Sequence, residues 1–186
     1  MELNAEMCGR SAQAARVVSL LEIESVIASH QQTLAPVITR DSVGAEQLSA
    51  GAVFMRPGWM SRPHIHERSE IVVMCLRGWA ATLVGPDMTP HLHGPGEFAY
   101  VPPGVLHVGV NLSRRSSLLA LEVRTDPTFH DDMVVVDDYE QAARAAVAAP
   151  QDRAAAGELE LPSDWEDSDS TVRWQQWVND GATAQW

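Results

Sequence analysis

Short apolar runs broken by glycine and proline dominate the chain between residues 41 and 128. In order they are GAVFM, PGWMSRP, IVVMCLRG, ATLVGPD, HGPGEFAYVPPG, VLHVGVNL and SLLALEV. Short strands separated by regular turn residues are typical of an antiparallel sandwich or barrel, so this region predicts an all-β domain. Residues 71–76 are apolar on both faces, which indicates a strand covered on both sides, with a second subunit as one candidate for the cover.

The segments on either side of this β domain have different patterns, and we expect three parts: an N-terminal extension (1–40), the β domain (41–128) and a C-terminal part (129–186). Residues 12–29 predict either a helix or a strand followed by a helix, because helical spacing is mixed with β-branched residues. Residues 138–149 predict a helix with one apolar face that ends before a proline.

Beyond Pro150 the chain becomes an acidic arm that carries four tryptophans, at positions 165, 174, 177 and 186. Residues 164–170 predict a loop, and Trp174 and Trp177 share a face if their segment is helical. Because a disordered tail has few aromatic residues, we expect this arm to pack on the β domain, over a pocket mouth or across a dimer interface.

Composition narrows the classes of partner. The chain has 186 residues and a formal net charge of -12, which argues against nucleic acid and anionic membranes as partners. All basic residues are arginine, which we attribute to the codon bias of a high-GC bacterial genome. The start of the chain lacks the pattern of a signal peptide, and no apolar run is long enough for a membrane span, so we expect a cytoplasmic protein.

The segment 62-RPHIHERSE-70 holds the first candidate chemistry. Strand side chains alternate between faces, so His64 and His66 point the same way, with the carboxylate of Glu70 close behind. This pattern indicates three converging metal ligands; the alternative is a pair of surface histidines in a polar loop.

A fourth candidate ligand, His107, follows the turn 102-PPG-104 at the start of a strand. Proline fixes the entry to such a turn and glycine permits a positive φ, so the turn is rigid. Three histidines and one glutamate on adjacent strands of a small barrel make a candidate metal site.

Two spacings in this region resemble the two sequence motifs of the cupin superfamily. The first combines a glycine, the HxH pair, an acid and a second glycine: Gly58, His64, His66, Glu70 and Gly78. The second combines a glycine, a P-x-G turn, a histidine and an asparagine: Gly96, Pro102, Gly104, His107 and Asn111. The glutamate follows His66 after three residues, a spacing that the family also uses. More narrowly, the chain resembles small stand-alone bacterial cupins of the mannose-6-phosphate-isomerase-like group.

The resemblance implies a double-stranded β-helix barrel with one divalent metal held inside by His64, His66, Glu70 and His107. Four protein ligands would close a tetrahedral zinc site but leave two positions open on a six-coordinate metal, so we favour iron or manganese. Zinc, nickel, cobalt or copper could also occupy such a site.

Four neighbouring residues are candidates for supporting roles. Arg62 precedes His64 by two residues and could hold an anionic substrate group, or it is a rim arginine paired with an acid. Tyr100 and Phe98 share a strand face, which either lines the pocket or packs in the core. Asn111 is expected to hydrogen-bond backbone near the metal site. His91 and His93 have no acid at matching spacing, so we expect both on the surface.

These features predict a metal-dependent enzyme acting on a small polar metabolite, with an oxygenase first. A non-redox isomerase, cyclase or lyase is close behind, and a non-catalytic metal-dependent binding barrel is the alternative from another class. A weaker hypothesis is an auxiliary protein that recruits a partner through the tryptophan-rich arm. The two-faced apolar strands also predict a homodimer.

Overall fold

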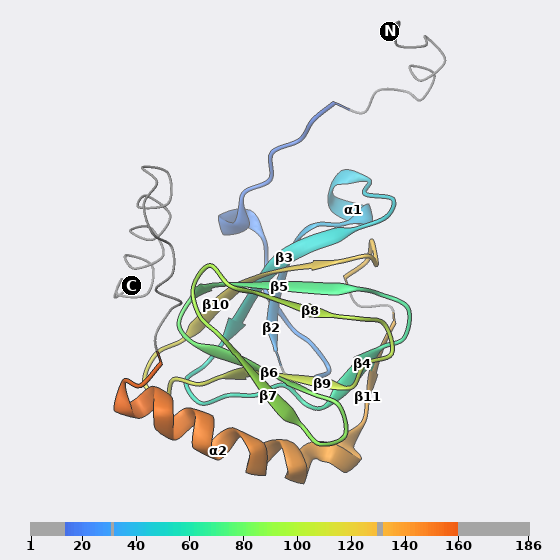
Figure 1. The fold of residues 1–186 in the computed structure, drawn as a ribbon. Helices are drawn as coiled ribbons and strands as arrows, with labels where there is room; N and C mark the ends of the chain where they lie inside the picture. Colours follow the sequence, from blue (N-terminus) through green and yellow to red (C-terminus); the bar gives the residue numbers. More distant parts are fainter. Residues whose placement is uncertain (1–13, 31, 130–131, 160–186) are drawn as a thin grey trace, which may run out of the picture.

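Two antiparallel sheets face each other and a long helix lies across the outside of one of them (Figure 1). The computed structural model describes residues 14–30, 32–129 and 132–159. The strands are β1 (Val26–Ile27), β2 (Thr33–Ile38), β3 (Ser49–Met55), β4 (His64–His66), β5 (Ile71–Arg77), β6 (Ala80–Val84), β7 (Thr89–His93), β8 (Phe98–Val101), β9 (His107–Asn111), β10 (Leu118–Arg124) and β11 (Met133–Val135). The helical segments are η2 (Leu20–Glu22), α1 (Arg40–Val43), η3 (Asp137–Tyr139) and α2 (Glu140–Ala156).

The order of the strands interleaves distant parts of the chain. One sheet runs β1-β2-β3-β10-β5-β8 and the other runs β11-β4-β9-β6-β7. Strand β10 pairs with both β3 and β5, and β9 pairs with both β4 and β6, all in antiparallel register. The all-β prediction is therefore confirmed. Strands β2 and β11 belong to the sheets, so the β structure extends beyond residues 41–128 on both sides.

Alternating side chains on β10 show how the interior changes character from one end to the other. Leu118 and Ala120 point inward into the apolar core between the sheets. The next two inward positions on the same strand are the buried, charged Glu122 and Arg124. Because period-2 alternation places all four side chains on one face, the barrel has an apolar end and a polar end. Cys75 belongs to the apolar core, and burial raises the pKa of its thiol to about 12, as expected of an inert cysteine.

Helix α2 packs against the outer face of the five-stranded sheet, on β6 and β7. Its Ala143 and Val147 belong to a second apolar cluster with Leu83 and Val108, which explains why β6 and β9 are apolar on both faces. The helix continues past Pro150 to Ala156, although the sequence predicted an end before the proline. Proline lacks the N–H for one helical hydrogen bond, and the apolar contacts of this buried segment offset that loss.

The N-terminal segment does not form the predicted helix. Residues 14–29 contain only η2 and β1, and the apolar side chains of Val17 and Leu21 are exposed. The tryptophan-rich arm, from residue 160 onward, lies outside the described residues. Among the described residues, no helix combines the length and the apolar character that a membrane crossing requires.

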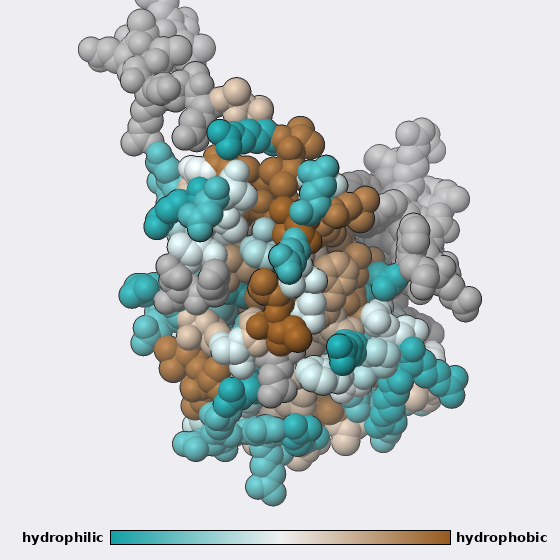
Figure 2. Space-filling view, turned by 180° about the vertical axis from the view of Figure 1, so that it is seen from behind, coloured by the Kyte–Doolittle hydropathy of each residue, from teal (hydrophilic) through white to brown (hydrophobic). Residues whose placement is uncertain are grey.

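The surface carries apolar side chains as well as charged ones. Seen from behind, the molecule shows them in a band between hydrophilic residues (Figure 2). The outward face of the six-stranded sheet holds an apolar row, because Met74 of β5 is in register with Phe98 of β8 and Leu121 of β10. Phe98 and Leu121 are both exposed.

Candidate metal centre

Three histidines meet inside the barrel because β4 and β9 are neighbours. The Cα atoms of His64 and His107 are direct partners in the antiparallel register. His66 follows on the same face of β4 by strand alternation. All three side chains are buried, and each offers a ring nitrogen within 4.8 Å of the others. The predicted convergence of these three residues is therefore confirmed.

Backbone carbonyls fix the orientation of two of the rings. The Nδ1 of His64 lies 2.8 Å from the carbonyl oxygen of Arg62, and the Nδ1 of His107 lies 3.0 Å from the carbonyl oxygen of Val105. A carbonyl oxygen can only accept a hydrogen bond, so each Nδ1 must carry the proton. The Nε2 of each neutral ring is then left with a free lone pair, which is the form that binds a metal.

A buried carboxylate orients the third ring. The Nδ1 of His66 donates to the Oδ1 of Asp132 at 3.2 Å. The other oxygen, Oδ2, accepts from the backbone N–H groups of Arg68 and Ser69 at 3.0 and 2.7 Å and from the Ser69 hydroxyl at 2.6 Å. Carboxylate–histidine pairs of this kind raise the basicity of a metal ligand and fix its tautomer. Asp132 was missed by sequence reasoning, because it lies 66 residues from His66 and matches no local motif.

Burial keeps the three imidazoles neutral. It is the largest cause that lowers the pKa of His64, of His66 and of His107, and it brings the pKa of His107 to about 4. The neighbouring imidazoles lower the pKa values of His64 and His107 further, because two positive rings at this spacing repel. At pH 7 the group therefore presents neutral, deprotonated Nε2 atoms. The imidazole donors, their tautomers and the convergence of their Nε2 atoms all fit the binding of a divalent metal ion.

Glu70 does not join this group. Its side chain is exposed, and its backbone N–H donates to the Thr125 hydroxyl at 2.9 Å on the flank of β10. The inward position next to it belongs to Ile71, which is buried and lines the cavity. Residues 67–70 form no strand, so the alternation that starts at His64 restarts at Ile71 and turns Glu70 outward. The structure thus brings together three of the four predicted ligands, His64, His66 and His107, and leaves Glu70 outside the group.

A different carboxylate, Glu122, lines the cavity from β10. Its Oε1 accepts from the guanidinium of Arg124, which also donates to the carbonyl of Phe129 and lies 4.4 Å over its ring. Burial by itself raises the pKa of Glu122, but the charge and hydrogen bond of Arg124 outweigh it and lower the pKa. The sequence signal was available: Glu122 and Arg124 occupy alternate positions of an otherwise apolar strand.

Three residues expected to bind substrate lie elsewhere. Arg62 points to the rim, where its Nε donates to the Asp137 carboxylate at 3.0 Å, so the alternative of a paired rim arginine applies. Phe98 and Tyr100 do share a face, but it is the outward one, with 65% and 57% of their surface exposed. None of the three lines the cavity.

Asn111 does hydrogen-bond backbone, but far from the histidines. Its amide group donates to the carbonyl oxygens of Met55, Arg56 and Ser116 at 2.8–3.2 Å. It lies four residues from His107 on β9, about 13 Å along the strand. Its role is to join loops at the opposite end of the barrel.

Two further histidines were not expected near the site. His30 is buried and stacks on His64, with ring centroids 4.6 Å apart. His93 is 6% exposed and lines the cavity, so the prediction that it lies on the surface was wrong; only His91 is exposed. His91 and His93 share a face of β7 by strand alternation, but burial increases along the strand, so His93 at its end is covered and His91 is not.

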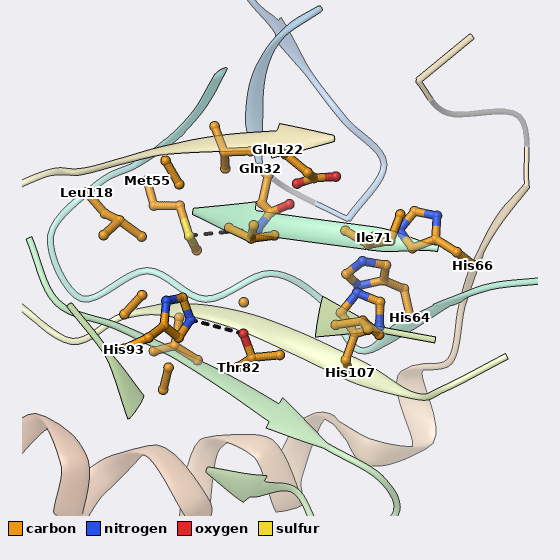
Figure 3. A pocket seen from close by; sticks show the side chains of 18 residues that line it. Gln32, Met55, His64, His66, Ile71, Thr82, His93, His107, Leu118 and Glu122 are labelled. Carbon is orange, nitrogen blue, oxygen red and sulfur yellow. Dashed lines mark hydrogen bonds between the residues drawn. The ribbon is translucent and has the colours of Figure 1, made fainter. Parts of the chain in front are cut away.

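The cavity lies between the two sheets, with the three histidines at one end and His93 at the other (Figure 3). About 40 Å³ is open to the centre of a water molecule, and one water needs roughly 10–15 Å³ of such space. The apolar part of the wall comprises Val53, Met55, Ile71, Val73, Ala80, Ala81, Val101, Val110, Leu118 and Ala120. The cavity thus suits a small molecule with a short apolar portion.

Comparison with known proteins gives structural matches only. No family model and no curated protein matches the sequence. A sugar phosphate isomerase of the cupin superfamily from Silicibacter pomeroyi matches with a TM-score of 0.51 and 24% identity, over 59% of this chain and 75% of that one. The polyketide cyclase RemF from Streptomyces resistomycificus matches with a TM-score of 0.56 and 20% identity, over 72% and 99%. This chain has the cupin fold.

The predicted double-stranded β-helix is thereby confirmed, since a double-stranded β-helix protein from Klebsiella pneumoniae also matches, with a TM-score of 0.52 and 14% identity, over 66% of this chain and 98% of that one. The first two of these matching proteins are described as an isomerase and a cyclase, so the fold alone does not determine the reaction. Any functional assignment for this chain must come from its own cavity.

Proposed function

We propose that this cupin is a mononuclear metal-dependent enzyme that acts on a small polar metabolite inside the barrel. The observation that carries the proposal is the convergence of three buried, neutral imidazoles, each with its Nδ1 held by a hydrogen-bond acceptor. Burying such groups costs free energy, and a metal ion would compensate that cost by using all three lone pairs.

A divalent metal bound by these histidines would supply Lewis acidity and, if it is iron or manganese, electron transfer. Three protein donors leave open positions on the metal whether it is tetrahedral or six-coordinate. A zinc ion bound here would therefore also keep an open coordination position. Neutral donors also leave the charge of the metal uncompensated, which favours an anionic oxygen donor on the substrate. We retain iron or manganese as the first choice, with zinc, nickel, cobalt or copper as alternatives.

Oxygenation is the reaction that we propose first. A six-coordinate metal with three protein ligands has room for a substrate donor and dioxygen together, and the apolar wall limits the access of water. The chain contributes by orienting the substrate between the two sheets.

A non-redox isomerase, cyclase or lyase is the second candidate, and Glu122 is the observation that favours it. Arg124 keeps this carboxylate ionised within the cavity wall. An ionised carboxylate beside a metal-bound substrate can accept a proton, which such reactions require.

The test combines metal analysis with oxygen consumption. Protein purified without chelators is loaded anaerobically with Fe(II) and mixed with a panel of small hydroxy and oxo carboxylates. The proposal predicts about one metal per chain and turnover that His64→Ala abolishes and that the exposed control His91→Ala leaves unchanged. Oxygen uptake supports the oxygenase, and turnover without oxygen supports the second candidate. Failure to bind metal would overturn both.

A further inference from the structure

His93 occupies the end of the cavity opposite the three histidines (Figure 3). Its side chain is more than nine-tenths buried and contributes to the cavity wall. Strand register sets the separation: on β6, Ala80 pairs with His93 and Val84 pairs with His107. The backbones of His93 and His107 are thus about 13 Å apart along the strands and about 10 Å apart across them, because β7 and β9 flank β6. The side chains of both residues line the same cavity, so one small molecule between them can contact both ends.

One nitrogen of the His93 ring has a hydrogen-bond partner among the described residues and the other has none. The Nε2 lies 3.1 Å from the hydroxyl oxygen of Thr82, which is also buried. The Nδ1 is buried and has no hydrogen-bond partner among the described residues. A buried polar atom without a hydrogen-bond partner destabilises a protein, and the majority of buried polar atoms in proteins are paired. An oriented ring with an unpaired nitrogen in a cavity wall is suited to bind a ligand.

The surroundings define the chemistry of that ligand. Burial lowers the pKa of His93 to about 4, so the ring is neutral at pH 7. The charged residue of the cavity wall is Glu122, which lies on the side nearer the three histidines (Figure 3). Because the His93 ring is neutral and the residues that line the cavity include no cation, this end of the cavity does not favour an anionic group of a ligand. A hydroxyl group can donate to Nδ1 or accept from it, so it fits either tautomer, whereas a carbonyl fits only the tautomer in which Thr82 donates to Nε2 and Nδ1 carries the proton.

We propose that His93 is a specificity-determining residue, which binds a neutral hydroxyl or carbonyl at the end of the substrate distal to the metal. The substrate would then be a short bifunctional molecule: an oxygen donor for the metal at one end, a few carbons against the apolar wall, and a neutral polar group at the other. This inference rests on the proposed function, because the metal at the three histidines determines which end of the substrate faces His93.

Isosteric pairs of probes test the distal contact. 4-Hydroxybutanoate and pentanoate have the same number of heavy atoms and differ only in the terminal hydroxyl or methyl group. The pairs 3-hydroxypropanoate with butanoate and 5-hydroxypentanoate with hexanoate vary the length. Each is titrated into the full chain, labelled with ¹⁵N at histidine and loaded with Zn(II), and the ring nitrogens are followed by NMR.

The proposal predicts that at least one hydroxy acid shifts the Nδ1 resonance of His93 and binds roughly 3- to 10-fold more tightly than its methyl analogue. His93→Leu combined with Thr82→Val should remove that preference, whereas the exposed control His91→Leu should keep it. The proposal is overturned if all three pairs bind without preference, or if the double variant retains it.

Two readouts separate this proposal from the proposed function and from a structural role. Zn(II) should shift the Nε2 resonances of His64, His66 and His107; if it does not, the metal proposal fails, and the same titrations on metal-free protein still decide the contact at His93. The double variant should also melt no lower than the wild type without ligand, because it removes an unpaired buried nitrogen. A large drop in Tm would show that His93 is structural and would contradict the proposal.

Discussion

Asp132→Asn should damage either stability or metal binding, because the groups around the carboxylate all donate hydrogen bonds to it. If the Asn oxygen faces His66, its NH₂ group meets the backbone N–H groups of Arg68 and Ser69, which lose their acceptor. If the amide is reversed, it donates toward His66, and the ring must take the other tautomer with its proton on Nε2. The first orientation costs stability and the second costs metal affinity.

The magnitude follows from the carboxylate's environment. Burial by itself raises the pKa of Asp132, but the hydrogen bonds from Ser69, Arg68 and His66 outweigh it and lower the pKa from 3.8 to about 2. This difference corresponds to about 2 kcal/mol of stability, present above pH 4 and lost as the pH falls toward 2. We therefore expect Asp132→Asn to lower the free energy of unfolding by about 2–3 kcal/mol, or to weaken metal binding by about 10–100-fold.

Urea unfolding at pH 7 and at several values between 4 and 2, together with competitive Zn(II) titration, measures both effects. The variant should lose part of the stability difference that the wild type shows between pH 4 and 2. Asp152→Asn is the control, since its carboxylate pairs with Arg114 on the exposed surface and is worth less than about 1 kcal/mol. If Asp132→Asn resembled this control in stability and in metal affinity, the argument for a carboxylate-oriented ligand would be refuted.

Three further changes have defined outcomes. Glu70→Gln should leave the metal dissociation constant within about twofold of the wild-type value in the same titration, because the side chain is exposed; a tenfold loss would restore it as a ligand. Gly51→Ala should destabilise the protein by about 1–3 kcal/mol in urea unfolding, because a Cβ there would lie 2.5 Å from the carbonyl oxygen of Ala35; an unchanged midpoint would contradict the close packing of β2 on β3. The apolar row on the six-stranded sheet should make wild type a dimer in light scattering and Phe98→Glu a monomer, and a monomeric wild type would refute the predicted homodimer.

The β domain could be predicted from the sequence because its signals are local. Alternation places His64 and His66 on one face of β4, and the strand that follows the turn at 102–104 places His107 beside them. Glu70 lies outside the group of three histidines, and spacing along the chain could not show this, because it does not reveal where a loop interrupts the alternation. The loop at 67–70 resets the phase of the strand.

The remaining features depend on tertiary contacts. Asp132 reaches His66 from a distant segment, and His93 is buried only because the opposite sheet covers its face of β7. Helix α2 continues through Pro150 because its packing on β6 and β7 outweighs the helix propensity of one residue. No local pattern could have shown these three outcomes.

The most direct test of the central claim is anomalous diffraction from crystals of the full chain grown with Co(II) or Zn(II). The account predicts a single strong peak inside the barrel, bonded to the Nε2 atoms of His64, His66 and His107, with Glu70 turned away. A peak elsewhere, a ligand set that includes Glu70, or no peak inside the barrel at saturating metal would contradict it.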